Sequence, residues 1–380
     1  MCLCRRAGDL RAGSAKWLVN YTEGGEARVK EASGARACYD ALRNGCGDVN
    51  LQMVSILGPA REGKSTLMNA LTGGVAEHFA VGHEVDPCTA GVDLELAMLP
   101  PSCMDVEDVS LVDEAKTSAP SAESNASYRV ALVDVEGQGD KEENLDVCLA
   151  LPILLTSKVV LFNWRGGFQK EKILTSLALL RTAAHRVATD MDSDEDSDSD
   201  DDSNSNRRFG HLIVVLRDYS CDSTVKKVER KLFRDERGTN KGEESRNAIR
   251  KNLRDEFESL SVQVIPPPPQ DVDDLVAFMA KAPAVAQLRA KISQQLASGP
   301  KLFNGEAITG TTAAALVPAL VAAVNSSKIV SLKAAWVVVE EAMAARVLED
   351  LREQLQSRID QKRTLHCVEG KNWVPPMALE

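Results

Sequence analysis

The amino-acid sequence predicts an α/β fold with a mostly parallel sheet flanked by helices, followed by a short α-helical region. Apolar, β-rich runs alternate with segments whose apolar residues recur at helical spacing, which is the pattern of strands and helices in alternation. The first apolar run leads directly into the glycine-rich stretch GPAREGKS at 58–65. A hydrophobic content of 44% supports a large core, and an aromatic content of only 4% makes that core aliphatic.

The expected elements follow in chain order. Strands are expected where β-branched and apolar residues run together, at 51–57, 128–135, 158–164, 211–218 and 261–265. Helices are expected where apolar residues recur at steps of three or four, at 64–71, 171–187, 311–324 and, as one long amphipathic helix, from Ile329 to Ile359. We expect the last two helices to pack against the preceding α/β domain.

Composition divides the chain into four parts. Residues 1–45 form an N-terminal lead segment, 46–300 the α/β domain, 301–365 a partial helical domain and 366–380 an irregular tail. Inside the α/β domain, residues 190–206 read DMDSDEDSDSDDDSNSN, which cannot form a core and repels itself. We predict a disordered insert there. A calcium loop is the alternative, but the glycine and terminal glutamate of an EF-hand are missing.

Charge and cysteine usage restrict the class of protein. The net charge of −11 argues against a nucleic-acid partner, which favours a basic surface. Nine scattered cysteines without a C-x-x-C pair indicate reduced thiols and a cytoplasmic protein, not a disulfide framework or a zinc site. Every apolar run is shorter than the roughly 20 residues of a membrane-spanning helix, so we expect no intrinsic membrane anchor.

The stretch after the first strand has the composition of a phosphate-binding loop. Gly58 is followed by four residues and then by Gly63, Lys64 and Ser65. Glycines let backbone N–H groups approach phosphate oxygens, the lysine reaches the β- and γ-phosphates, and the serine hydroxyl ligates Mg²⁺. A glycine-rich turn between core elements is the alternative. Because the motif lies between a strand and a helix, we predict the P-loop NTPase fold.

Two later segments supply partners for this loop. VDVEGQGD at 133–140 places Asp134 and Gly137 at the end of an apolar strand. Asp134 is suited to hold Mg²⁺ through a water, and the Gly137 N–H to meet the γ-phosphate. Thr89, in DPCTAGVDL, is a candidate for the mobile threonine that closes on both, and an ordinary loop threonine is the alternative.

The strand at 211–218 bears on the choice of nucleotide. It ends in Arg217 and Asp218, and the guanine-reading N-K-x-D motif is missing there. An aspartate accepts hydrogen bonds from the N1–H and 2-amino group of guanine, whereas adenine offers no such pair of donors. The chemistry therefore favours guanine, and a solvated loop entry is the alternative.

Four segments together resemble one protein family. GPAREGKS, CTAGVDL, DVEGQGD and VVLRDYS closely resemble the guanylate-binding protein and atlastin branch of the dynamin-like large GTPases. That branch uses Arg-Asp in place of Asn-Lys-x-Asp and carries a D-x-E-G signature, matched here by Asp134, Glu136 and Gly137. The resemblance spans about residues 45–360 and is closer to the guanylate-binding proteins, because no membrane hairpin follows.

The resemblance implies a role for each matched position. Arg61 matches an internal arginine finger, which neutralises charge that develops on the γ-phosphate. Glu136 matches a glutamate that helps to organise the water network. The catalytic set implied is Arg61, Lys64, Thr89 and Glu136. The nucleotide-binding set is Gly58, Arg61, Glu62, Gly63, Lys64, Ser65, Thr66, Thr89, Gly137, Arg217 and Asp218, and the Mg²⁺ set is Ser65, Thr89 and Asp134.

The sequence also departs from the family pattern. Guanylate-binding proteins carry a serine two residues before the switch threonine, where this chain has Pro87, which cannot relay a proton. The helical part after residue 300 is also short, because family members continue into a long helical stalk.

The sequence therefore predicts a cytoplasmic GTPase that hydrolyses GTP to GDP and phosphate with Mg²⁺. The resemblance implies nucleotide-dependent homodimerisation through the GTPase domain. One alternative is a nucleotide-switched interaction module that binds GTP with little turnover. Another is an ATP-using P-loop enzyme such as a kinase.

Overall fold

The computed structural model describes most of the chain, and the fold is stated for that part. The described residues are 13–73, 78–81, 91–104, 128–139, 142–187, 208–220, 224–238, 240–326 and 329–368, with side chains to 362. Thr89, Pro87 and the acidic insert at 190–206 lie outside these ranges, so the predictions made for them stay predictions.

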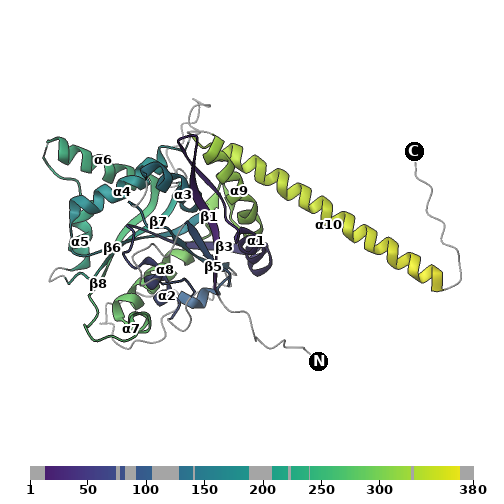
Figure 1. Ribbon diagram of the computed structural model, residues 1–380, viewed down its shortest axis with the longest axis horizontal. Helices are drawn as coiled ribbons and strands as arrows, with labels where there is room; N and C mark the ends of the chain where they lie inside the picture. The colour runs from purple at the N-terminus through teal and green to yellow at the C-terminus, as the bar shows by residue number, and fades with distance from the viewer. Residues whose placement is uncertain are drawn as a thin grey trace.

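The central sheet of the described residues has the strand order β2-β1-β4-β5-β3-β6-β7-β8 (Figure 1). Strands β5, β3, β6, β7 and β8 run parallel, and β2, β1 and β4 extend the sheet in antiparallel pairing. The parallel strands are Tyr128–Val135 (β5), Asn50–Leu57 (β3), Ser157–Arg165 (β6), Phe209–Arg217 (β7) and Phe257–Ile265 (β8). The predicted mostly parallel sheet and its five strands are confirmed.

The antiparallel strands were not predicted. They are Ser14–Glu23 (β1), Glu26–Glu31 (β2) and Val92–Glu95 (β4). The first two form a hairpin inside the stretch that the sequence assigned to a lead segment. The outer strand β2 buries only Val29, so it lacks the apolar alternation that identifies a half-buried strand.

Helices cover both faces of the sheet (Figure 1). One face packs against α2, α7 and α8, which span Lys64–Leu71, Leu275–Lys281 and Pro283–Ala297. The other face packs mainly against α1 (Ala35–Ala41), α3 (Glu143–Thr156), α4 (Lys170–Ala184), α5 (Val225–Phe233), α6 (Lys241–Glu256) and α9 (Gly310–Ser326). Helix α3 was not predicted, because it is buried nearly all round and so has no amphipathic period.

The two C-terminal helices behave differently. Helix α9 joins the same hydrophobic core as the sheet, as expected. Helix α10 (Leu332–Val368) buries only its first turns, where Trp336 stacks on Phe303 with ring centroids 5.9 Å apart. The rest extends away from the body with Leu351 and Leu355 exposed, so the expectation that both helices pack on the α/β domain was wrong for α10 (Figure 1). The division at residue 300 stays a prediction.

The end of α9 is fixed to the edge of the sheet. Asn325 donates from Nδ2 to the Val29 carbonyl at 2.6 Å and accepts from the Val29 N–H through Oδ1 at 2.9 Å. The Asn325 amide therefore bonds to strand β2 as a neighbouring strand would.

Two further expectations bear on the class of protein. The cysteines among the described residues, Cys38, Cys46, Cys103 and Cys148, are all free. Within the described ranges, none of the helices combines the length and apolarity that a membrane span requires.

Candidate nucleotide-binding site

The predicted site residues that the structure describes lie at the carboxyl ends of the parallel strands. The loop at 58–63 follows β3, Asp134 lies near the end of β5, Asn163 and Arg165 end β6, and Arg217 ends β7. These strands are parallel, so their carboxyl ends meet at this edge, which is where ligands bind in open α/β sheets. The structure therefore brings together motifs that are up to 160 residues apart (from 58 to 218).

The phosphate loop has a backbone that requires its glycines. Gly58 has φ of 137°, and a Cβ there would lie 2.2 Å from the Asn163 carbonyl oxygen. Gly63 has φ of 68° and precedes α2, whose first residue is Lys64. Arg61 also adopts a left-handed conformation, with φ of 62°, although it is not glycine. Such backbone is unfavourable for a residue with a side chain and is found mainly at functional loops.

Lys64 and Ser65 point to two different partners. Lys64 is 6% exposed as a residue, and its ammonium donates to the Pro59 carbonyl at 3.1 Å, so the side chain folds back over the loop. The Ser65 hydroxyl donates to Oδ2 of Asp134 at 2.5 Å, and Asp134 is fully buried. The predicted lysine, serine and aspartate are therefore adjacent at the start of α2.

The oxygen donors at this point fit Mg²⁺. Hydroxyl and carboxylate oxygens are the ligands that Mg²⁺ prefers, and it is usually bound by one or two carboxylates together with waters and substrate phosphates. Across the described ranges, no group of three His, Cys, Asp or Glu side chains is arranged to hold a metal by itself. Ser65 and Asp134 therefore fit a cation that arrives with a phosphate and completes its coordination from it.

The loop after β5 is paired with the phosphate loop. The Ala60 N–H donates to the Gln138 carbonyl at 3.1 Å, and the Gln138 N–H donates to the Gly58 carbonyl at 3.0 Å. A Cβ on Gly137 would lie 2.1 Å from the Ala60 Cα, so only glycine allows this approach. Gly137 therefore lies against the phosphate loop, and its predicted contact with the γ-phosphate stays a prediction.

Glu136 contacts the backbone that enters β4. Its Oε2 accepts from the Gly91 N–H at 2.8 Å, and its own N–H donates to the Gly91 carbonyl at 2.6 Å. Gly91 follows the segment that carries Thr89, which the structure does not describe. Glu136 thus ties Gly91, directly before β4, to the loop after β5.

Arg217 lies beneath the phosphate loop and not in the solvent. It is 3% exposed, and Nη1 donates to the carbonyls of Gly63 at 2.6 Å and Glu62 at 3.2 Å. Burial lowers the pKa of Arg217. A Cβ on Gly63 would lie 2.7 Å from Nη1, so this glycine also makes room for the guanidinium. Arg217 is therefore placed to hold the loop in position, and the side chain of the next residue, Asp218, is 19% exposed.

Asp218 has a partner that the sequence analysis missed. Nε of Arg165, the last residue of β6, donates to Oδ2 of Asp218. Asp218 adopts φ of 54°, a conformation that aspartate tolerates better than most residues. No motif marks Arg165, and its position at the carboxyl end of a predicted strand was the available signal. The pKa of the nearby Glu62 is raised, because the effect of burial outweighs the lowering by the charges of Arg165, Arg217 and Lys64.

A cavity of about 440 Å³ opens beside Arg217 and Asp218. Its walls are mostly apolar and come from the end of β8, the proline run that follows and α7, including Val264, Ile265, Pro266, Phe278 and Met279. Phe278 is 39% exposed, which is high for a large apolar side chain. The cavity combines flat apolar surfaces with one carboxylate at its edge, which is typical of small-ligand sites.

Comparison with known proteins agrees with this geometry. A family model described as guanylate-binding protein, N-terminal domain, matches residues 45–298, which is more than half of the chain. The chain belongs to the guanylate-binding protein family. The matched range contains the phosphate loop, Asp134, Arg217 and Asp218, while the β1–β2 hairpin, α9 and α10 of this guanylate-binding family member lie outside it.

Solved structures give weaker similarity. A bacterial selenocysteine-specific elongation factor, EF-Sec, is 13% identical with a TM-score of 0.31, over 67% of this chain and 30% of that one. Two variants of SsGBP are each 14% identical, with TM-scores of 0.31 and 0.28, over 66% of this chain and 56% of theirs. The chain thus spans less than two thirds of these proteins, and scores this low carry no argument about function. A search of curated proteins finds no match.

Proposed function

We propose that this protein binds GTP together with Mg²⁺ and hydrolyses it to GDP and phosphate. The observation that carries the proposal is that Arg217 joins the two halves of the site. Its guanidinium holds the carbonyls of Gly63 and Glu62 in the phosphate loop, and its neighbour Asp218 faces the apolar cavity. Arg217 therefore fixes how far the phosphate loop lies from the cavity proposed to hold the base.

The start of α2 supports the proposed binding of the nucleotide's phosphates. Its backbone N–H groups and partial positive charge favour the β- and γ-phosphates, and the Lys64 ammonium can exchange the Pro59 carbonyl for a phosphate oxygen. Mg²⁺ would be held by Ser65 directly, by Asp134 through a water and by Thr89, and it would neutralise phosphate charge. Residues Gly137 and Thr66 contribute backbone N–H groups in this proposal.

The hydrolytic step is assigned to Arg61 and Glu136. Arg61 is exposed in the strained part of the loop, so its guanidinium can reach the γ-phosphate and stabilise charge in the transition state without a second protein. Glu136 would order the attacking water after its hydrogen bond to the Gly91 N–H is rearranged. Both assignments rest on the family resemblance and on the proximity of these residues to the loop.

The choice of guanine rests on the cavity. A purine fits between apolar walls such as Ile265 and Phe278, and the Asp218 carboxylate accepts from the N1–H and the 2-amino group. Adenine would present an acceptor at N1 to the same carboxylate, which is repulsive. The site therefore favours GTP over ATP.

Three further features belong to the proposal. Homodimerisation through the nucleotide face is taken from the family resemblance alone. A cytoplasmic setting is supported by the free cysteines, since reduced thiols are typical of that compartment. A GTP-binding module with little turnover is the alternative, and it is favoured by Pro87 at the position of the proton-relaying serine.

The decisive experiment compares released phosphate from GTP and ATP, with Mg²⁺, for the wild-type protein and the Arg61→Ala variant. We expect GTP-selective turnover in the wild type and a loss of at least about a hundredfold in the variant. Tight GTP binding without turnover would support the binding module. Equal use of ATP would contradict the guanine assignment. Lys251→Ala, an exposed cation on α6, is the matched control and is expected to leave turnover unchanged.

A further inference from the structure

We propose that Arg165 is a positioning residue that orients the Asp218 carboxylate toward guanine and so contributes to base selectivity. The inference rests on the proposed function, because it requires guanine to be the ligand of Asp218. Arg165 comes from β6 and Asp218 follows β7, so the contact links two neighbouring strands at the edge where the cavity opens.

The contact leaves room for the base. Nε of Arg165 donates to Oδ2 of Asp218, and the two side chains are 53% and 19% exposed. A carboxylate offers about four lone-pair positions. The arginine takes one of them, so two others can still accept the N1–H and the 2-amino group of guanine. Arg165 therefore restrains one oxygen of the carboxylate without using up its capacity to accept.

The turn that carries Arg165 is itself attached to the base-reading loop. The Gly166 N–H donates to the Arg217 carbonyl at 3.1 Å, directly before Asp218. The rings of Phe168 and Tyr219 lie 6.3 Å apart, directly after it. Gly166 has φ of 86° and Gly167 of 67°, so the tight turn needs these two glycines. Arg165 thus approaches Asp218 from a turn fixed on both sides of it.

The freedom left to Asp218 lies in its side chain. Its backbone follows Arg217, which is buried and bonded to the phosphate loop, so the Cα position is set by the same contacts that place the phosphates. Rotation of the carboxylate remains, and Arg165 limits it. Because a half-exposed ion pair adds little to folding stability, we expect the effect of Arg165 in nucleotide selectivity and not in stability.

The test is a binding experiment with GDP and ADP, each with Mg²⁺, on the wild type and on Arg165→Ala. We expect the variant to lose GDP affinity about tenfold, as for a hydrogen bond to a charged group, and to keep ADP affinity within about twofold. The GDP-to-ADP preference therefore falls about tenfold. Arg36→Ala, which removes another exposed arginine paired with an aspartate (Asp40, 4.0 Å), should leave the preference unchanged.

A double-mutant comparison separates positioning from a general structural effect. In an Asp218→Ala background, Arg165→Ala should change the GDP-to-ADP preference by less than about twofold, because there is no carboxylate left to orient. Arg165→Lys, which keeps the charge but not the planar Nε donor, should fall between wild type and alanine.

Three results would overturn the inference. An unchanged preference in Arg165→Ala would show that the arginine does not orient the carboxylate. If Arg165→Ala lowered the GDP-to-ADP preference equally in the Asp218→Ala background, its effect would not act through the Asp218 carboxylate. Tighter GDP binding by Arg165→Ala would show that the arginine competes with guanine. A wild type that binds GDP and ADP equally would instead contradict the proposed function.

Discussion

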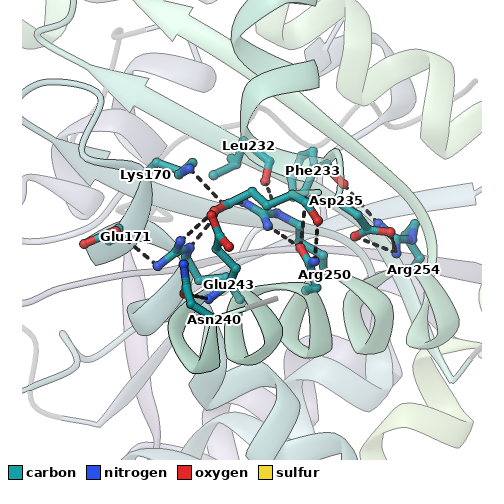
Figure 2. Close-up of polar contacts among 12 residues, drawn as sticks. Lys170, Glu171, Leu232, Phe233, Asp235, Asn240, Glu243, Arg250 and Arg254 are labelled. Carbon is teal, nitrogen blue, oxygen red and sulfur yellow. Dashed lines mark hydrogen bonds and ion pairs between the residues drawn. The ribbon is translucent and has the colours of Figure 1, made fainter. Parts of the chain in front are cut away.

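Two clusters of charged side chains in this protein use arginine in different ways. The first, the Glu236 cluster, joins Lys170 at the start of α4 to Arg246 and Arg250 of α6 through Glu236 in the loop before α6 (Figure 2 labels Lys170 and Arg250). There the carboxylate of Glu236 accepts from Lys170 at 2.8 Å, Arg246 at 2.6 Å and Arg250 at 2.8 Å. The second cluster lies at the candidate site, where Arg217 donates to the carbonyls of Gly63 and Glu62.

The two clusters differ in whether each cationic side chain contacts a carboxylate. In the Glu236 cluster a carboxylate meets each cation, which is the arrangement of a structural ion-pair network. Within the described part of the chain, the Arg217 guanidinium donates to neutral carbonyl groups and to the Met279 sulfur, and its buried Nε has no hydrogen-bond partner there. Its charge therefore acts on the phosphate loop, where an anion is expected. Contact with a carboxylate thus distinguishes the arginines of the Glu236 cluster from Arg217.

The largest expected effect concerns the fold. Arg250 is fully buried, and it donates to the Leu232 carbonyl at 2.8 Å, to Asn247 at 2.7 Å and to Glu236. Arg250→Ala removes these three hydrogen bonds from a buried part of the cluster and is expected to lower the free energy of unfolding by about 3 kcal/mol. Urea denaturation measures this. The GDP-to-ADP preference should stay the same, and a change in it would contradict the assignment of this cluster to structure.

The second effect concerns the ligand. Arg217→Ala removes two hydrogen bonds from a charged donor to the phosphate loop and is expected to weaken binding of GDP about a hundredfold. ADP binding should weaken by a similar factor, because the loop is common to both nucleotides. Isothermal titration calorimetry measures both affinities. Arg234→Ala is the control, because Arg234 is an exposed arginine after α5. If Arg217→Ala bound nucleotide with wild-type affinity, Arg217 would not contribute to the site.

A glycine substitution tests the space that Arg217 occupies. Gly63→Ala puts an alanine in a left-handed backbone conformation, which lowers the free energy of unfolding by about 1–2 kcal/mol. It also places the alanine Cβ 2.7 Å from Nη1 of Arg217. Gly24→Ala in the β1–β2 turn has φ of 60° and nothing within 4 Å of its Cβ, so it carries the same backbone strain without the contact. We expect both to lower the melting temperature and only Gly63→Ala to weaken GDP binding, by about tenfold. Equal GDP affinities would show that the close approach to Arg217 does not matter.

The smallest effect is a pH dependence. The hydrogen bond from Arg246 holds the pKa of Glu236 well below its usual 4.5, against the effect of burial and with help from Lys170 and Arg250. The ionised carboxylate therefore stabilises the fold fully above the unfolded pKa, and this contribution is lost as pH falls through the folded pKa. Unfolding measured from pH 7 to 3 should show Glu236→Gln less stable at pH 7 and approaching the wild type in acid. Parallel curves would contradict this.

Sequence patterns predicted the parts of the fold that repeat a local period. Strands β3, β5, β6 and β7 are continuous apolar runs and were placed within two residues of their observed ends. The β1–β2 hairpin was missed because its burial depends on β4 and α9, which are distant in the chain. Helix α3 was missed for the opposite reason, since a helix buried all round carries no period.

The candidate site was predictable where chemistry fixes spacing. Lys64, Ser65 and Asp134 were identified from motifs, and the structure brings the Ser65 hydroxyl to the Asp134 carboxylate. The buried position of Arg217 was not predictable, because it depends on how closely β7 approaches the loop after β3. Arg165 was missed since a single arginine at the end of a strand belongs to no motif.

The hydrogen bonds between Asn325 and Val29 can form only after α9 has been synthesised. The Asn325 amide lies 296 residues further along the chain than Val29, the residue of β2 that it bonds. A ribosome that adds about 5–20 residues per second needs tens of seconds to reach it. During that time the hairpin can form, but one edge of it has no neighbour. The outer strand of the sheet that carries the candidate site therefore gains its hydrogen bonds to α9 only after α9 has been synthesised.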